Sequence, residues 1–164
     1  MELSIAQNDD FGRVVEIYNL AIPSRLSTAD TTLATVESKR EWLQSHSQSR
    51  PLYVVKLQNK IVGWASFQSF YGRPAYHATV ELSIYIDPAY QNKVIGSTVL
   101  KECIDKAPGL GITNILGFVF AHNIGSIKLL KKHGFVQWGN LPEVAEMDGK
   151  LYSLTIHGFK VETS

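Results

Sequence analysis

The stretch TVELSIYIDPAYQNKVIGSTVL, residues 79–100, reads as a strand, a short loop and the beginning of a helix. From Thr79 to Tyr85 polar residues alternate with apolar ones, which is the two-residue period of a strand whose faces differ. Over residues 96–107 the apolar side chains instead fall on one helical stripe. A strand that passes through a short loop into a helix is typical of α/β domains.

The remainder of the chain extends this pattern in both directions. Two β-rich runs, residues 51–57 and 60–70, are separated only by Gln58 and Asn59, which predicts an antiparallel hairpin. The predicted helices cover residues 9–21, 37–46, 96–107 and 123–133, and the predicted strands cover residues 51–57, 60–70, 79–87, 113–120, 135–138 and 149–159. This order contains no repeat and no linker. It predicts a single domain over residues 1–164, of the α/β (α+β) class, with a mixed central sheet flanked by about four helices.

Composition and charge exclude several classes of protein. The 164 residues are 45% hydrophobic and 19% charged, and 16 basic residues against 15 acidic ones give a net charge of +1. Nucleic-acid and membrane-surface binders need a basic surface, so neither kind of partner is expected. The longest apolar run, residues 115–121, is far shorter than the ~20 residues of a membrane helix, and the first ten residues lack the basic and apolar blocks of a targeting signal. We expect a cytoplasmic protein.

Metal and disulfide chemistry find no support in the sequence. The five histidines lack the spacing of a zinc site, and the single Cys103 excludes an internal disulfide. Cys103 also falls on the apolar stripe of residues 96–107, where a core role is expected rather than a nucleophilic one. No bound metal is therefore expected.

The loop before the helix of residues 96–107 is a candidate anion site. Consecutive backbone N–H groups at a helix start can face a phosphate, and the helix dipole adds to the attraction. A single glycine at this point is also typical of an ordinary capped loop, so the loop alone leaves both interpretations open.

Longer motifs decide between these two interpretations. The stretch of residues 79–100, the later HNIGSIKLLKKHGF at residues 122–135 and the order of elements resemble the GCN5-related N-acetyltransferase superfamily over nearly the whole chain. RPAYHATVELSIYI (73–86), AEMDGKLYSLTI (145–156) and STADTT (27–32) are similar to its branch of phosphinothricin and methionine sulfoximine acetyltransferases. The resemblance implies an enzyme that uses acetyl-CoA as co-substrate.

The resemblance also implies which residues hold the co-substrate. The pyrophosphate loop would consist of Gln91, Asn92, Lys93, Val94, Ile95, Gly96 and Ser97, and the backbone of Ile84, Tyr85 and Ile86 would bind the pantetheine arm. Asn123 and Lys132 would contact the co-substrate from the last helix. For these two, the residues alone equally allow a helix N-cap at Asn123, with Ser126 in the first turn, and a solvated charge at Lys132.

Val94 departs from the family pattern, in which a glycine is usual at this position. A valine does not readily adopt a positive φ, and its Cβ adds bulk near a phosphate. Either Val94 keeps an ordinary backbone conformation with its side chain turned away, or the affinity for CoA is weakened. We expect the former, because the rest of the motif is intact.

Glu81 is the candidate catalytic residue. An amine must lose a proton before it attacks a thioester, and Glu81 stands at the position of the family's catalytic glutamate, on the strand face that carries Ser83 and Tyr85. Composition alone would favour a surface carboxylate here. A base at this position would work best with its pKa raised by partial burial, acting directly or through a water molecule.

Leu130 occupies the position at which many relatives carry a Tyr or His that protonates the leaving CoA thiolate. A thiolate with a pKa of about 8.5 to 9 is a tolerable leaving group, so we expect it to leave unaided. The alternatives are that the acid is absent or comes from elsewhere. His133, three residues on, is expected to be a helix cap or dipole partner.

The acceptor side depends on two loops. Arg73, Tyr76 and His77 match the branch segment that recognises the carboxylate of an amino-acid-like substrate, with His77 where an arginine is often found. Arg73 could equally be a solvated loop residue, although a guanidinium suits a carboxylate. Thr28 and Thr31, in a loop rich in Ser and Thr, are expected to line the cleft.

Together these features predict an N-acetyltransferase that moves the acetyl group of acetyl-CoA to the primary amine of a small amino-acid-like molecule, of the phosphinothricin or methionine sulfoximine type, by direct attack in a ternary complex. The alternatives are a non-catalytic acyl-CoA-binding module, suggested by Val94 and Leu130, and an acetyltransferase of protein N-termini or polyamines. The family commonly forms dimers, so we expect a homodimer with the aromatic stretch of residues 67–76 in its interface.

Overall fold

A computed structural model describes residues 1–91 and 93–162, with the exception of the Lys93 side chain. Asn92, which was assigned to the pyrophosphate loop, lies outside the described residues. In chain order the elements are β1 (Glu2–Ile5), α1 (Phe11–Ala21), α2 (Val36–Gln44), β2 (Leu52–Leu57), β3 (Lys60–Ser69), β4 (Thr79–Ile86), α3 (Lys93–Lys106), β5 (Asn114–Phe120), α4 (Ile124–Lys132), β6 (Val136–Met147) and β7 (Lys150–Lys160).

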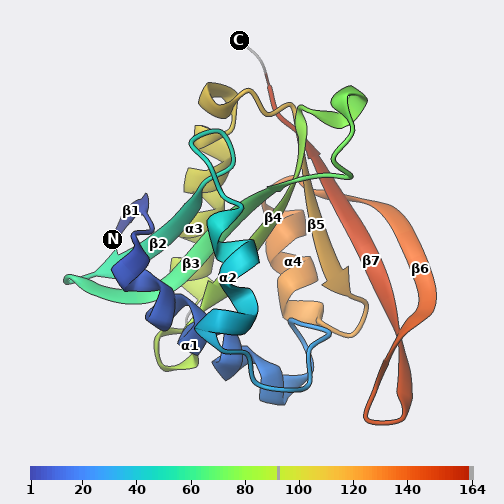
Figure 1. The fold of residues 1–164 in the computed structure, drawn as a ribbon. Helices are drawn as coiled ribbons and strands as arrows, with labels where there is room; N and C mark the ends of the chain where they lie inside the picture. The colour runs from blue at the N-terminus through green and yellow to red at the C-terminus, as the bar shows by residue number, and fades with distance from the viewer. Residues whose placement is uncertain (92, 163–164) are drawn as a thin grey trace.

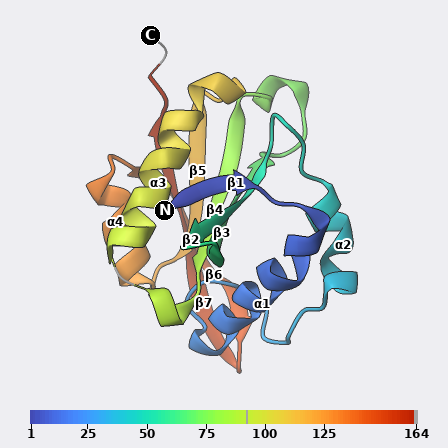
Figure 2. The same ribbon diagram turned by 90° about the vertical axis from the view of Figure 1, so that its left-hand side faces the viewer.

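The strands form one mixed sheet in the order β1-β2-β3-β4-β5-β7-β6. Neighbouring strands are antiparallel except β4 and β5, which are parallel because α3 returns the chain across the sheet between them. α1 and α2 cover one face of the sheet, and α3 and α4 cover the other (Figures 1 and 2). The predicted class, a mixed sheet flanked by four helices, is confirmed. In the part of the chain that is described, no helix is long and apolar enough to span a membrane.

Each face of the sheet has its own apolar core. Val80 and Leu82 of β4 belong to the core under α3, whereas Tyr85 packs with the core under α1 and α2. The predicted alternation along this strand is therefore confirmed. The α3 side buries Val99, Leu100, Cys103 and Ala107, which are residues of the predicted stripe. Fully burying one aliphatic side chain of this size contributes about 1.5–3 kcal/mol, so the two cores fix the sheet between its helix layers.

The hairpin predicted around Gln58 and Asn59 is confirmed. These residues have φ values of 50° and 64°, and they join β2 to β3. Positive φ at both central residues is the geometry of a type I′ turn, whose twist matches that of the flanking strands.

One strand was missed and two predicted boundaries were wrong. β1 was not predicted, since four residues, none of them fully buried, carry too little pattern to mark a strand. β6 extends to Met147 rather than ending at Trp138. It is an edge strand, so it tolerates Pro142 and register irregularities that disguise it in the sequence. α3 begins at Lys93, three residues earlier than predicted, which places Val94 within the helix.

Candidate active site

The parallel pairing of β4 and β5 ends early and opens a gap in the sheet. The two strands pair only from Thr79 to Glu81 on β4, opposite Asn114 to Leu116 on β5. Among the described residues, the remainder of β4, down to Ile86, has β3 as its only strand partner, and the Ile86 carbonyl accepts from Gln91 Nε2 at 3.5 Å. β4 therefore has a free backbone edge beside the start of α3.

The hydrogen-bond alternation of β4 shows which backbone groups face this gap. The Asp87 N–H donates to the Val62 carbonyl at 2.8 Å, and the Thr79 carbonyl accepts from the Phe70 N–H at 3.1 Å, so odd-numbered residues of β4 are turned towards β3. Because successive residues of a strand turn their N–H and C=O groups to opposite sides, Ile84 and Ile86 present theirs to the gap. Tyr85, in contrast, turns its backbone N–H and C=O groups towards β3, where its register partner is Trp64.

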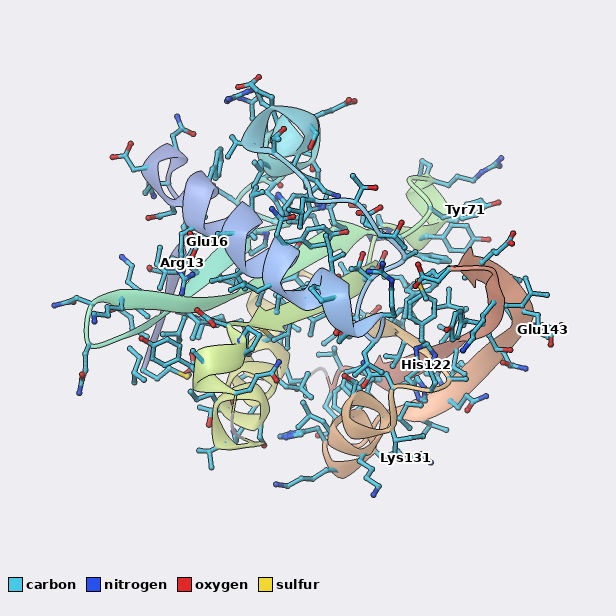
Figure 3. The ribbon with its side chains drawn as sticks, turned by 90° about the horizontal axis from the view of Figure 1, so that it is seen from below. Arg13, Glu16, Tyr71, His122, Lys131 and Glu143 are labelled. Carbon is cyan, nitrogen blue, oxygen red and sulfur yellow. The ribbon has the colours of Figure 1, made fainter. Side chains whose placement is uncertain are left out.

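The turn from β4 to α3 is held by a buried ion pair. The Asp87 carboxylate, 11% exposed, accepts from Arg13 Nη2 of α1 at 2.6 Å and from the Ala89 N–H at 2.9 Å. The Arg13 guanidinium lowers the pKa of Asp87. Arg13 also pairs with Glu16 one helical turn on, so that Arg13 and Glu16 lie side by side on α1 (Figure 3). The start of the loop is thus fixed to the opposite helix layer.

The first turns of α3 contain the predicted pyrophosphate loop. Val94 has an α-helical backbone, as the first of the two expected arrangements requires, and the residue is 72% exposed. Its effect on the affinity for CoA stays a prediction. A Cβ built on Gly96 would meet only Leu129, at 3.6 Å, which is an ordinary contact. Gln91 is exposed, and its Nε2 lies 3.5 Å from the Ile86 carbonyl. These positions suit an anion at the helix start, and the contacts to a co-substrate stay predictions.

Ser97 makes a contact that the sequence did not indicate. Its Oγ lies 2.7 Å from His133 Nε2, which ties the first turns of α3 to the C-terminus of α4. His133 is the C-cap of α4, so the expected capping role is confirmed. Burial is the main cause that lowers the pKa of His133, followed by Lys132 and Lys101.

Asn123 and Lys132 lie at opposite ends of α4. Asn123 is the N-cap: its side-chain oxygen accepts from the Ser126 N–H at 3.2 Å, and its Nδ2 donates to the Leu26 carbonyl at 3.2 Å. Lys132 is an exposed residue of the last turn, next to Lys131 (Figure 3). The structure thus supports the capping interpretation of Asn123, and a co-substrate contact by either residue stays a prediction.

Glu81 lies at the point where β4 and β5 separate. Its register partners are Gln68 on β3 and Leu116 on β5, and its side chain shares a face with Ser83 and Tyr85. It is half-buried, and among the described residues no side chain or backbone group hydrogen-bonds to its carboxylate. Burial therefore raises the pKa of Glu81. Its catalytic role stays a prediction.

An aromatic pocket of about 130 Å³ opens beside Glu81 on the α1 and α2 face. The indole of Trp64 stacks on the Tyr85 ring, with centroids 4.6 Å apart, and Trp42 closes the other side at 5.3 Å from Trp64. Ser83 lines the pocket and lies about 7 Å along the strand from Glu81. The remaining lining residues are Val14, Val15, Tyr18 and Lys39.

Thr28 and Thr31 differ from the expectation that both line the cleft. Thr28 is buried, and its Oγ1 bonds to the Tyr18 hydroxyl at 2.6 Å. It therefore reaches the aromatic pocket through the hydroxyls of Tyr18 and Tyr85. The pKa of Tyr18 is raised to about 12 by burial and by its bond to Asp30. Thr31 is exposed and is not part of the pocket lining. The loop that carries Thr28 and Thr31 thus holds Tyr18 of the pocket in place, and neither threonine lines the pocket.

Arg73, Tyr76 and His77 line a second pocket, of about 320 Å³, at the other end of the strand face, and their contact with a substrate stays a prediction. Arg50, from the chain before β2, also lines this pocket and donates to the His77 carbonyl. The Arg50 Nε atom is buried with no hydrogen-bond partner among the described residues. The predicted clamp residues therefore meet a second arginine that the sequence pattern did not indicate.

The sequence interpretation missed most of the residues around Glu81. Trp64, Ser66 and Gln68 alternate along β3 and so share the face of Glu81. Trp42 lies in the last turn of α2, and His46 follows the end of that helix, with its ring edge-on to Trp42. The alternation along β3 is visible in the sequence, but the pairing of β3 with β4 was needed to bring these residues to the carboxylate.

Metal ligands do not gather in this region. Across residues 1–91 and 93–162, no group of three His, Cys, Asp or Glu side chains is placed to share a metal ion.

Known proteins resemble this chain over almost its whole length. It is 50% identical over 159 residues (96% of this chain, 98% of the relative) to YwnH of Bacillus subtilis (strain 168), whose name places it provisionally among the phosphinothricin acetyltransferases. It is 26% identical over 156 residues (94% and 91%) to the L-methionine sulfoximine/L-methionine sulfone acetyltransferase of Salmonella typhimurium (strain LT2). The structure of YncA from Salmonella typhimurium with its cofactor acetyl-CoA superposes with a TM-score of 0.91 at 25% identity, covering 100% of this chain and 95% of that one.

The profile of the Acetyltransferase (GNAT) family matches residues 11–135, which run from the start of α1 to just beyond the end of α4. This range contains both sides of the β4–β5 gap and the start of α3. With this match and the 50% identity to YwnH, the chain belongs to the Acetyltransferase (GNAT) family.

Proposed function

We propose that this acetyltransferase moves the acetyl group of acetyl-CoA to the primary amine of a small amino-acid-like molecule, by direct attack in a ternary complex with Glu81 as the base. The observation that carries the proposal is the position of Glu81, a half-buried carboxylate at the mouth of the β4–β5 gap and beside an aromatic pocket. Relatives named for phosphinothricin and methionine sulfoximine support this acceptor class.

The gap and the start of α3 suit acetyl-CoA. Ile84 and Ile86 offer backbone donors and acceptors on the free edge of β4, which can hold the amide-containing pantetheine arm as an added strand would be held. The N–H groups at the start of α3 suit the pyrophosphate, because the helix dipole favours negative charge there. The structure of YncA with acetyl-CoA supports this choice of co-substrate.

The chemistry at Glu81 follows from its surroundings. An amino group arrives as an ammonium ion, and one N–H bond breaks as the Glu81 carboxylate takes the proton. The free amine then forms a bond to the thioester carbon, the C–S bond breaks, and the sulfur leaves as a thiolate. The nitrogen then loses a second proton to solvent, so the products are the neutral amide, the CoA thiolate and protonated Glu81. Leu130 packs against the core under α3, so the thiolate receives no proton from that side chain.

The charges of the two pockets favour an acceptor with an anionic group. Arg50 and Arg73 line the larger pocket, and Lys39 lines the aromatic one. Within the described part of the chain, neither lining includes an Asp or Glu. A polyamine would meet like charge here, whereas the carboxylate of an amino acid would find a guanidinium partner.

We also propose a cytoplasmic homodimer with no nucleic-acid or membrane partner. Large apolar side chains are exposed along the sheet edge, namely Val136, Trp138, Leu141 and Val144 of β6 and Leu151 of β7. Tyr71, 72% exposed, lies on the same side of the molecule as Glu143 of β6 (Figure 3). An unpaired strand edge with apolar side chains is a common pairing surface. The buried, unpaired Cys103 is typical of a reducing compartment.

Release of CoA thiol from acetyl-CoA tests the proposed activity. Phosphinothricin, methionine sulfoximine, common amino acids, polyamines and short peptides serve as acceptors, and a reaction without acceptor controls for acylation of Cys103. We expect acceptor-dependent release with an amino-acid-like amine. Binding of acetyl-CoA without turnover for any amine would favour a binding module, and preference for a polyamine or peptide would contradict the acceptor class.

A further inference from the structure

Three polar side chains form a hydrogen-bonded group beside Glu81, and the proposed mechanism does not use them. His46 follows the end of α2, with its ring edge-on to Trp42 at a centroid distance of 4.9 Å. Its Nε2 lies 2.7 Å from Ser66 Oγ and 2.9 Å from Gln68 Nε2, both on β3. These contacts bring α2 onto the strand that pairs with β4.

The hydrogen-bond partners of His46 determine its tautomer. Its Nδ1 lies 3.1 Å from the Leu43 carbonyl, which can only accept, so Nδ1 carries the proton. Burial is the largest cause of the lowered pKa of His46, so the neutral ring is favoured. The Nε2 of a neutral ring protonated at Nδ1 is an acceptor. It therefore accepts hydrogen bonds from the Ser66 hydroxyl at 2.7 Å and from the N–H of Gln68 at 2.9 Å.

Ser45 also favours the orientation of the Gln68 amide in which the NH₂ group faces the end of α2. The Ser45 hydroxyl donates to the Trp42 carbonyl at 2.6 Å, so its oxygen is left to accept from Gln68 Nε2, at 3.2 Å. Both N–H groups of the Gln68 amide are thus committed to acceptors on α2 and its C-terminal extension. The carbonyl Oε1 of the Gln68 amide receives no hydrogen bond from any donor in the described residues.

The register of the sheet places Gln68 next to Glu81. The two are direct partners in the β3–β4 ladder, and both side chains lie on the α1 and α2 face, as the stacked pair Trp64 and Tyr85 does four residues further along each strand. Side chains of such partners have their Cβ atoms about 4.5–5.5 Å apart. The free carbonyl of Gln68 therefore belongs to the direct cross-strand partner of Glu81, on the same face of the sheet.

We propose that His46 is a positioning residue for the proton transfer: together with Ser45 it holds the Gln68 amide so that its carbonyl oxygen, and not its NH₂ group, is presented to Glu81. The inference rests on the proposed role of Glu81 as the base. When an N–H bond of the ammonium breaks and the O–H bond forms on Glu81, the Gln68 oxygen accepts a hydrogen bond from the new O–H. No bond of Gln68 or His46 breaks.

The effect is on the basicity of Glu81. A carbonyl oxygen repels the ionised carboxylate and accepts from the protonated form, so it raises the pKa of Glu81 in addition to burial. A turned amide would offer N–H donors and lower that pKa. Four titratable groups face this region from the surrounding elements: Tyr85 on β4, His46 after the end of α2, Tyr18 on α1 and Lys39 on α2. Of these, Tyr85 is coupled to Glu81, which contributes to its raised pKa.

The test compares Gln68→Met and His46→Phe with the unchanged enzyme. Gln68→Met keeps the chain length and removes the carbonyl, and His46→Phe keeps a ring against Trp42 and removes the acceptor. The apparent pKa of the base is read from the pH profile of kcat/KM, and the pKa of Glu81 is read without turnover by ¹³C NMR of its carboxyl group. We expect Gln68→Met to lower both values by about 0.5 to 1 unit and His46→Phe to lower them in the same direction.

Control variants distinguish the positioning role of His46 from the proposed role of Glu81 as the base. Gln137→Met, the same exchange on exposed β6, should shift neither value. Adding His46→Phe to Gln68→Met should shift neither value further, because both act through one carbonyl. An unchanged or higher Glu81 pKa in Gln68→Met overturns the positioning role. If Gln68→Met does not fold, the same NMR titration is made on Ser45→Ala, at the exposed end of α2. The proposal then expects a lowered pKa of Glu81, and an unchanged or higher value overturns it. Full activity of Glu81→Gln would instead remove Glu81 as the base, and the NMR titration would still decide the effect of Gln68.

Discussion

Arg13 of α1 donates to the carboxylate of Asp87, at 2.6 Å, where β4 ends and the turn into α3 begins. The same guanidinium reaches the Ile61 carbonyl of β3 at 3.0 Å. One side chain from the first helix layer thereby fixes both the end of β4 and the neighbouring strand. The position of the proposed pyrophosphate loop depends on this contact, although Arg13 lies on the opposite face of the sheet from α3.

Asp87→Asn should therefore lower the free energy of unfolding at pH 7 by about 1–2 kcal/mol, since hydrogen bonds to charged groups contribute at this level. The pKa of Asp87 is lowered in the folded state, so its contribution is present above the ordinary value of 3.8 and is lost as the pH falls through the lowered value. Urea unfolding at pH 7 and near pH 3 measures both. Glu16→Gln, at the exposed partner of Arg13, should change stability by less than about 0.5 kcal/mol. Equal stability of Asp87→Asn and the unchanged protein at pH 7 would contradict the clamp.

Glu81→Gln should fold normally and lose roughly 10²–10⁴-fold in kcat, which is the usual contribution of a general base. Binding of acetyl-CoA, measured by calorimetry, should change little, because the proposed contacts to the co-substrate lie on Ile84, Ile86 and α3. The raised pKa of Glu81 means that the active carboxylate forms only above the ordinary value of 4.5, so the rate should rise with pH through a higher value. A rising limb that persists unchanged in Glu81→Gln would assign it to another group.

Glu81→Gln should also be more stable than the unchanged protein at pH 8. Burial raises the folded-state pKa of Glu81 above its unfolded value, so the ionised group destabilises the fold above that range and no longer does so at low pH. The substituted glutamine carries no charge, and a gain of up to about 1–2 kcal/mol corresponds to the cost of a buried group without a hydrogen bond. Thermal unfolding at pH 8 and pH 4 provides the comparison. A loss of stability at pH 8 would mean that the carboxylate has a stabilising partner.

Val94→Gly should leave the affinity for acetyl-CoA within about threefold, a difference of less than ~1 kcal/mol. Val94 already has a helical backbone, so glycine at this position relieves no strain. Titration calorimetry with acetyl-CoA measures the affinity, and Val94→Ala controls for loss of the side chain without added backbone freedom. A tenfold gain in affinity for Val94→Gly alone would show that the valine weakens the site.

The exposed apolar edge of β6 predicts that Val144→Lys yields monomers. Val144 is 59% exposed, and a lysine there would place a charge in the proposed interface. Light scattering after size-exclusion chromatography should give twice the 18.3 kDa chain mass for the unchanged protein and the single-chain mass for the variant. Leu20→Lys, at an exposed position of α1, should leave the dimer intact. A single-chain mass for the unchanged protein would exclude the dimer.

The elements with strong periodicity were predictable from the sequence, and the elements without it were not. The strand of residues 79–87 and the apolar stripe from Val99 to Ala107 were correct because one face of each is buried in a core, which imposes a regular pattern. β1 and the second half of β6 lie at the two sheet edges, where few side chains must be buried. Such strands are fixed by backbone pairing, which leaves little trace in side-chain identity.

The candidate site was predictable only where it is contiguous in the chain. Glu81 and the helix start around Gly96 are part of one motif, and the structure keeps them on adjoining elements. His46 and Gln68 meet Glu81 through the register of β3 with β4, and Arg50 meets His77 through a loop contact. A single sequence carries no information on register between particular residues, because a strand can pair with its neighbour at several offsets of two.

The early separation of β4 from β5 links the lifetime of the protein to its ligand. The sheet consists of four strands on one side and three on the other, joined by three residue pairs. A molecule that bridges the gap adds its binding energy to the folded state alone, about 2.7 kcal/mol at a concentration 100 times its Kd. In the proposed complex, the supply of acetyl-CoA would therefore govern resistance to proteolysis and heat as well as the rate of acetylation, and a starved cell would hold a more fragile enzyme.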